Sequence, residues 1–119
     1  MSATFEHQTD NLYLLKIVGE LKKSDLENSQ TDFVDYLAEA GAIKLLVLLE
    51  DFTGWEPGVE WGENSFFFTH GDYLEKIAIV GDPQWETEVM TFGGAGLRKG
   101  HMKYFSPSGE SEARAWLSE

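Results

Sequence analysis

The sequence contains no cysteine, and few of its charged residues are basic. The absence of cysteine excludes disulfide bonds, thiolate chemistry and cysteine-based zinc sites. Nine Lys and Arg residues stand against 21 Asp and Glu residues, so the formal net charge at pH 7 is -12. Nucleic acids and anionic membranes bind proteins through an excess of Lys and Arg. The composition therefore argues against both as partners.

Membrane and export signals are also missing. No window approaches the run of roughly 18 apolar residues that a membrane-spanning helix needs. The segment Met1–Gln8 lacks the basic start and the apolar stretch of a signal peptide. We therefore predict a cytoplasmic protein without membrane insertion. The length of 119 residues and the hydrophobic content of 42% predict a single domain, residues 1–119, with its own core.

The strongest structural signal is the uninterrupted apolar run Leu45–Leu49. A run this short and continuous is typical of a central parallel strand that is covered on both faces. We predict that this strand ends at Glu50 and Asp51 and is followed by a turn at Gly54. Further strands are predicted at Ala3–Gln8, Leu12–Val18, Lys76–Gly81 and Met102–Phe105. The turn residues Thr9–Asn11 join the first two strands as an antiparallel hairpin.

Helical patterns with recognisable N-terminal signals lie between and after these strands. The four predicted helices begin at a capping box of Ser24 and Glu27, at Pro57, at Asp82–Pro83, and at Ser106–Pro107. In the last helix, Ala113, Trp116 and Leu117 share one face. The element order ββαβαβαβα predicts an α/β fold. Its sheet should be mixed and mostly parallel, with an N-terminal antiparallel hairpin and right-handed crossovers.

Two stretches resemble a known family. They are Ile77–Trp85, which reads Ile-Ala-Ile-Val-Gly-Asp-Pro-Gln-Trp, and the ending Lys103–Leu117. Together with the element order they resemble the SpoIIAA-like family, small bacterial proteins grouped with STAS domains and, more loosely, with lipid-binding CRAL-TRIO domains. The resemblance covers nearly the whole chain. It implies a STAS-type fold and a non-enzymatic interaction or regulatory module that acts through protein–protein contacts.

The resemblance also implies a switch residue. In the related anti-sigma-factor antagonists, the loop after the corresponding strand reads Asp-Ser-Ser-Gly, and its second Ser is phosphorylated. The matching residues here are Asp51–Gly54, which read Asp-Phe-Thr-Gly. Thr53 is therefore the candidate phosphorylation or switch residue. Phe52 and the following Trp55 depart from the pattern of that branch.

Carboxylates follow several of the predicted strands. Ligands of open α/β sheets bind at the carboxyl ends of the parallel strands, and the residues there are Glu20, Glu50, Asp51, Asp82 and Ser106. Carboxylates suit Mg²⁺, but Asp82 and Ser106 also fit ordinary helix caps. The Gly93–Gly100 cluster closes a helix, whereas a phosphate loop opens one. Without a nucleophile elbow or a grouping of its histidines, the chain is predicted to be no enzyme and to hold no metal or cofactor.

The second predicted helix carries more aromatic surface than one helix face can bury. Phe66, Phe67 and Phe68 are consecutive, so they span about 200° of the helix circumference. We expect part of this surface to form a homodimer contact or a site for a protein partner. The alternatives are ordinary core packing and the wall of a pocket for a small apolar ligand, such as a lipid or fatty acid. The candidate residues are Trp55, Trp61, Phe66, Phe67, Phe68, His70 and Tyr73.

Overall fold

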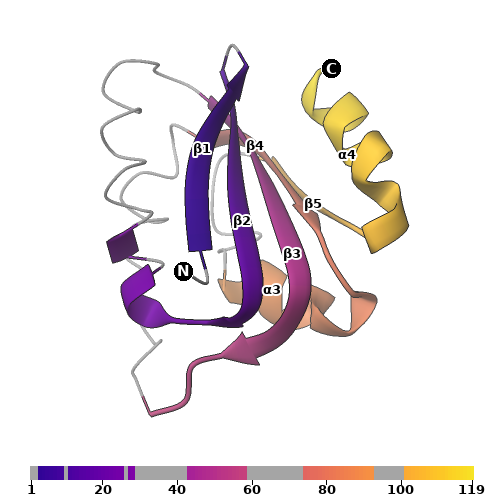
Figure 1. The fold of residues 1–119 in the computed structure, drawn as a ribbon. Coiled ribbons are helices and arrows are strands. Elements are labelled where there is room, and N and C mark those ends of the chain that lie inside the picture. Colours follow the sequence, from indigo (N-terminus) through magenta and orange to yellow (C-terminus); the bar gives the residue numbers. More distant parts are fainter. Residues whose placement is uncertain (1–2, 10, 26, 29–42, 59–73, 93–100) are drawn as a thin grey trace.

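The computed structural model describes residues 3–9, 11–25, 27–28, 43–58, 74–92 and 101–119 (Figure 1). Its sheet has five strands in the spatial order β1-β2-β3-β4-β5. Their bounds are Ala3–Thr9 for β1, Leu12–Leu21 for β2, Ile43–Trp55 for β3, Leu74–Val80 for β4 and His101–Phe105 for β5. β1 is antiparallel to β2, and the other neighbouring pairs are parallel. The predicted mixed sheet with an N-terminal hairpin is therefore confirmed.

The two helices near the C-terminal end agree with the prediction, whereas the second predicted helix does not begin at Pro57, because Pro57 and Gly58 form a turn in which Gly58 has a φ of 81°. α3 (Glu86–Phe92) follows the 3₁₀ turn η2 (Pro83–Trp85), and α4 (Glu110–Leu117) follows the 3₁₀ turn η3 (Pro107–Gly109). Residues 23–25 and 27–28 are also helical, so the first predicted helix starts within one residue of Ser24. The rest of that helix and nearly all of the predicted helix that starts at Pro57 lie outside the described residues. Across the described ranges, no helix is long and apolar enough to cross a membrane.

β3 supplies both layers of the core. Leu45 and Val47 belong to a cluster that includes residues of β1, β2, β4 and Val89 of α3. Leu46, with a relative exposure of 0%, belongs to a second cluster with residues of β4, β5 and α4. Successive side chains of a strand point to opposite faces, which explains the division. The prediction that this run is covered on both faces is confirmed.

α3 and α4 lie on opposite sides of the sheet (Figure 1). α4 packs its buried residues Ala113 and Leu117 against the sheet. The Nζ of Lys76 in β4 donates to the carbonyl oxygens of Trp116 at 2.9 Å and of Glu119 at 3.3 Å. The last carbonyls of a helix have no helical donor of their own. Lys76 therefore fastens the C-terminal end of α4 to the sheet.

Candidate functional site at the carboxyl ends of the strands

The segment after Glu50 is a strand and not the predicted turn. β3 continues through Trp55, and its last residues still pair with β2, Gly54 with Glu20 and Trp55 with Leu21. Gly54 has a φ of 118°, which glycine adopts readily. The predicted end of the strand was wrong because Asp and Gly mark β-bulges inside strands as well as turns between them.

Three residues of β3 form a bulge, which we call the β3 bulge (Asp51, Phe52 and Thr53). Val18 pairs with Glu50 and Glu20 pairs with Gly54, so Gly19 alone lies opposite these three residues. Asp51 has a φ of 49°, a left-handed conformation that is uncommon for residues other than glycine. The side chains of Asp51 and Thr53 are exposed. The bulge thus presents the candidate switch residue Thr53 at the surface.

The bulge also redirects Phe52 into the core. In a regular strand Phe52 would share the α4 side of the sheet with Leu46 and Leu48. It packs instead against the cluster of Leu45 and Val47 on the opposite side.

Phe52 contacts two tryptophans there. Its ring centroid lies 5.2 Å from that of Trp55 and 5.0 Å from that of Trp85, and the two tryptophans are 6.0 Å apart. All these contacts have the edge-to-face geometry that aromatic pairs favour. We call Phe52, Trp55 and Trp85 the aromatic trio. The inward position of Phe52 was missed because the bulge was not recognised.

The predicted rim carboxylates have separate local roles. Asp82 caps η2 by accepting a hydrogen bond from the Gln84 amide at 3.0 Å, as its predicted N-cap role requires. Glu20 binds the ammonium group of Lys22 at 2.6 Å. Ser106 occupies the N-cap position of η3, but its side chain makes no capping hydrogen bond. Within the described ranges, no group of three or more His, Asp or Glu residues is placed to hold a metal ion.

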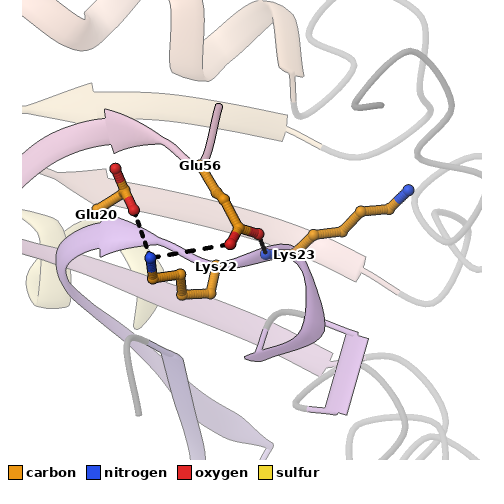
Figure 2. A network of polar contacts seen from close by, with 4 residues as sticks. All are labelled: Glu20, Lys22, Lys23 and Glu56. Carbon is orange, nitrogen blue, oxygen red and sulfur yellow. Dashed lines mark hydrogen bonds and ion pairs between the residues drawn. The ribbon is translucent and has the colours of Figure 1, made fainter. Parts of the chain in front are cut away.

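Glu56 joins the end of β3 to the start of the first helix (Figure 2). Its amide donates to the Leu21 carbonyl at 2.9 Å, and its carboxylate accepts from the Lys23 amide at 3.3 Å. The carboxylate is also 3.9 Å from Lys22 Nζ. The hydrogen bond that Lys22 donates to Glu20, and then the negative charge of Glu20, raise the pKa of Lys22 above its ordinary value. No sequence pattern signals this network, because Glu56 and Lys23 are 33 residues apart.

Tyr104 supports the turn that carries Trp85. Its hydroxyl donates to the Asp82 carbonyl at 2.7 Å. Burial, and then the charges of Asp82 and Glu86, raise the pKa of Tyr104 to about 12. Gly81 leaves room for this contact, since a Cβ at that position would lie 2.8 Å from the hydroxyl. Tyr104 and Gly81 therefore place η2 beside the aromatic trio.

We expect alkaline pH to destabilise the fold through Tyr104. Its pKa is about 12 in the folded protein and 10.0 ordinarily, so the unfolded chain releases this proton first. The contribution of Tyr104 to the free energy of unfolding is therefore fully present below pH 10 and is lost as the pH rises toward 12. Urea unfolding between about pH 9 and 11 should show a shallower loss of the free energy of unfolding for Tyr104→Phe than for the wild type. Parallel losses would contradict the assignment.

The other residues of the predicted aromatic surface lie outside the described residues. They are Trp61, Phe66, Phe67, Phe68, His70 and Tyr73. Trp55, the remaining member, is half-buried in the aromatic trio. The homodimer contact and the apolar pocket expected from this set stay predictions.

Comparison with known proteins identifies the fold and the family. The chain matches the family model described as SpoIIAA-like over residues 12–118. A protein of the DUF3478 family from Shewanella loihica PV-4, which has a SpoIIAA-like fold, superposes with a TM-score of 0.73 at 21% identity, over 97% of this chain and 91% of that one. Comparison with curated proteins gives no match.

Two structures of SpoIIAA itself are also similar. The anti-sigma factor antagonist in its unphosphorylated form gives a TM-score of 0.63 at 12% identity, over 96% of this chain and 97% of that one. The phosphorylated form, described as a Bacillus cell fate determinant, gives 0.59 at 16% identity, over 97% and 98% of the two chains. The similarity confirms the predicted fold, and the family match confirms the resemblance seen in the sequence.

Proposed function

The chain belongs to the SpoIIAA-like family, and on that premise we propose that it is a non-enzymatic regulatory module that binds a protein partner. The similar SpoIIAA structures are those of an anti-sigma factor antagonist that exists in unphosphorylated and phosphorylated forms. The observation that carries the proposal is the β3 bulge, because it exposes Asp51 and Thr53 at the carboxyl end of a central strand.

The proposed contact surface is formed by Val18, Glu50, Asp51 and Thr53, and we call it the rim surface. Val18 is the large hydrophobic residue exposed in the described part of the chain, at 41%. It pairs with Glu50 directly beside the bulge. A single exposed apolar side chain is ordinary, but here it adjoins an exposed hydroxyl and two exposed carboxylates. Such a mixture of an apolar group and polar groups suits a protein contact.

The polar groups near the carboxyl ends of the strands have structural roles, which favours binding over chemistry. Asp82 caps a turn, Tyr104 holds that turn, and Glu56 bonds the start of a helix. Catalytic sites concentrate groups with perturbed pKa values. The pKa of Lys22 is raised by its hydrogen bond with Glu20, and the pKa of Tyr104 is raised by burial. Both shifts therefore have a structural cause.

We further propose that phosphorylation of Thr53 controls the contact. Thr53 is exposed on the bulge. In sequence it lies between Asp51 and Glu56 and three residues after Glu50. A phosphate adds a charge of roughly −1.5 to −2 at pH 7. Repulsion between the phosphate and these carboxylates would disturb the conformation of the bulge and thereby change the rim surface that a partner binds.

Thr53→Asp is expected to abolish capture of the protein partner from a cell extract. The introduced charge lies on the rim surface, next to Asp51. Thr4→Asp is the matched control, since Thr4 is exposed on β1 and does not belong to the rim surface. Immobilised wild type and both variants are compared by mass spectrometry of the captured proteins. The control should retain what the wild type binds, and equal capture by all three proteins would contradict the proposed surface.

Two further readouts complete this experiment. Incubation of the wild type with the extract and ATP should yield phosphorylated Thr53, and its absence under conditions that phosphorylate a known antagonist counts against the switch. Native mass spectrometry of the freshly purified protein reports bound small molecules. A stoichiometric apolar ligand there would favour the carrier function over a protein partner.

A further inference from the structure

The end of β3 is held in an unfavourable backbone conformation. Asp51, which is not a glycine, adopts a left-handed φ of 49°. Residues in such sparsely populated regions persist only where the surrounding structure holds them, and they concentrate at switch regions.

A second register is available to this strand end. If the ladder continued regularly from the Val18–Glu50 pair, Phe52 would lie opposite Glu20 and Thr53 opposite Leu21. In the structure Gly54 and Trp55 occupy these two positions. The two registers differ by a shift of two residues, which is about 7 Å along the strand. The regular register would remove the left-handed residue, and it would also take Phe52 away from the aromatic trio.

Two sets of contacts hold the bulged register. Phe52 packs against Trp55 and Trp85. Beyond the bulge, the Glu56 amide donates to the Leu21 carbonyl. The Glu56 carboxylate accepts from the Lys23 amide (Figure 2). A displacement of about 7 Å would break both Glu56 bonds, because hydrogen bonds weaken steeply beyond about 3.2 Å.

Glu56 therefore connects the register to the first helix. Lys23 is the first helical residue after β2, and the first amides of a helix have no acceptor within the helix. In the bulged register the Glu56 carboxylate supplies an acceptor from a segment 33 residues away. In the regular register that acceptor is withdrawn.

We propose that the end of β3 switches between a bulged and a regular register, and that Glu56 transmits the change to the N-terminal turn of the first helix. The rim surface and the first helix then form one conformational unit. Use of this unit by a partner rests on the proposed function. The register change itself is measured without a partner. The register proposal and the proposed binding function can therefore fail independently.

The test is amide hydrogen exchange and chemical shifts by NMR on the full chain, for the wild type, Asp51→Gly and Glu56→Gln. Asp51→Gly relieves the left-handed conformation and should favour the bulged register. Exchange of the Lys23 amide should become about fivefold slower, although the substitution lies in a different segment. Glu56→Gln weakens the charged acceptor and should speed the same exchange severalfold.

The chemical shifts distinguish a switch from a local effect. If the two registers exchange, the substitutions change only the populations of the two registers. The amide signals of Thr53 and Gly54 should then shift along one line, in one direction for Asp51→Gly and in the opposite direction for Glu56→Gln. Glu20→Gln is the control, because it removes the closer partner of Lys22 and leaves the Lys23 bond in place. It should leave the exchange of the Lys23 amide unchanged.

Two results would overturn the inference. The first is exchange of the Lys23 amide in Asp51→Gly that equals the wild-type rate. The second is a Glu56→Gln effect confined to residues 23 and 56, with the bulge signals unmoved. Asp51→Gly removes strain, so it keeps the test decisive even if Glu56→Gln weakens the fold.

Discussion

Val47→Asp is expected to unfold the protein. Val47 has a relative exposure of 7% and pairs with Leu15 on one side and Ile79 on the other. Its side chain packs in the cluster that joins four strands and α3. An unpaired carboxylate buried there costs several kcal/mol or must take up a proton. Single domains have total stabilities of only about 5–15 kcal/mol, and the substitution also removes the packing of the valine.

Circular dichroism during heating measures this effect. The wild type should show a cooperative transition that Val47→Asp lacks at neutral pH. Thr53→Asp is the matched control, because it places the same side chain on the same strand at an exposed position. The control should melt close to the wild type. A cooperative transition of Val47→Asp near that of the wild type would contradict the central, doubly covered position of β3.

Gly81→Ala should give the second-largest effect. A Cβ at Gly81 would lie 2.7 Å from Leu49 Cδ1, 3.0 Å from Leu49 Cβ and 2.8 Å from the Tyr104 hydroxyl. Leu49 Cβ is attached to the backbone of β3, so the contact cannot be relieved by a side-chain rotation alone. Overpacking of this kind costs about 1–3 kcal/mol. The melting temperature should fall by several degrees for each kcal/mol lost.

Two comparisons isolate the steric cause. Gly109→Ala is the control, because its Cβ would meet Phe105 Cβ at an ordinary 3.4 Å, and it should be nearly neutral. In a Tyr104→Phe background the hydroxyl is gone, so Gly81→Ala should cost less than in the wild type. Additive costs in this double-mutant cycle would show that Tyr104 takes no part in the clash.

The strands were predictable because their signals are local. The apolar run Leu45–Leu49 and the stretch Ile77–Val80 are too short for buried helices and lie between helix signals, so they indicate covered strands without further information. Asp82–Pro83 likewise predicts a helix start with Asp82 as its N-cap, and the hydrogen bond that Asp82 accepts from the Gln84 amide confirms this cap. Each of these signals resides within a few residues of the structure it specifies.

The candidate site was less predictable because it depends on distant segments. Asp51–Gly54 reads as a turn, and only its pairing with residues 18–21 of β2 makes it a bulge. Glu56 meets Lys23 across 33 residues of chain, and Trp85 reaches Phe52 from a different strand–helix unit. Propensity and periodicity carry no information about such pairs. Thr53 was found through family resemblance, not through any physical signal of its own.

The order of the strands has a consequence for how the chain acquires its structure. Each strand lies beside the strand that precedes it in sequence, so the sheet can grow in the direction of synthesis by adding one edge at a time. The β1–β2 hairpin alone would be marginally stable in water, and β3 turns it into a three-stranded platform. Leu46 and Ala78 are nevertheless covered by α4, which is formed by residues 110–117. Among the described residues, the cover of this face is therefore completed only when α4 has been made, and exposed apolar surface on a nascent chain favours aggregation.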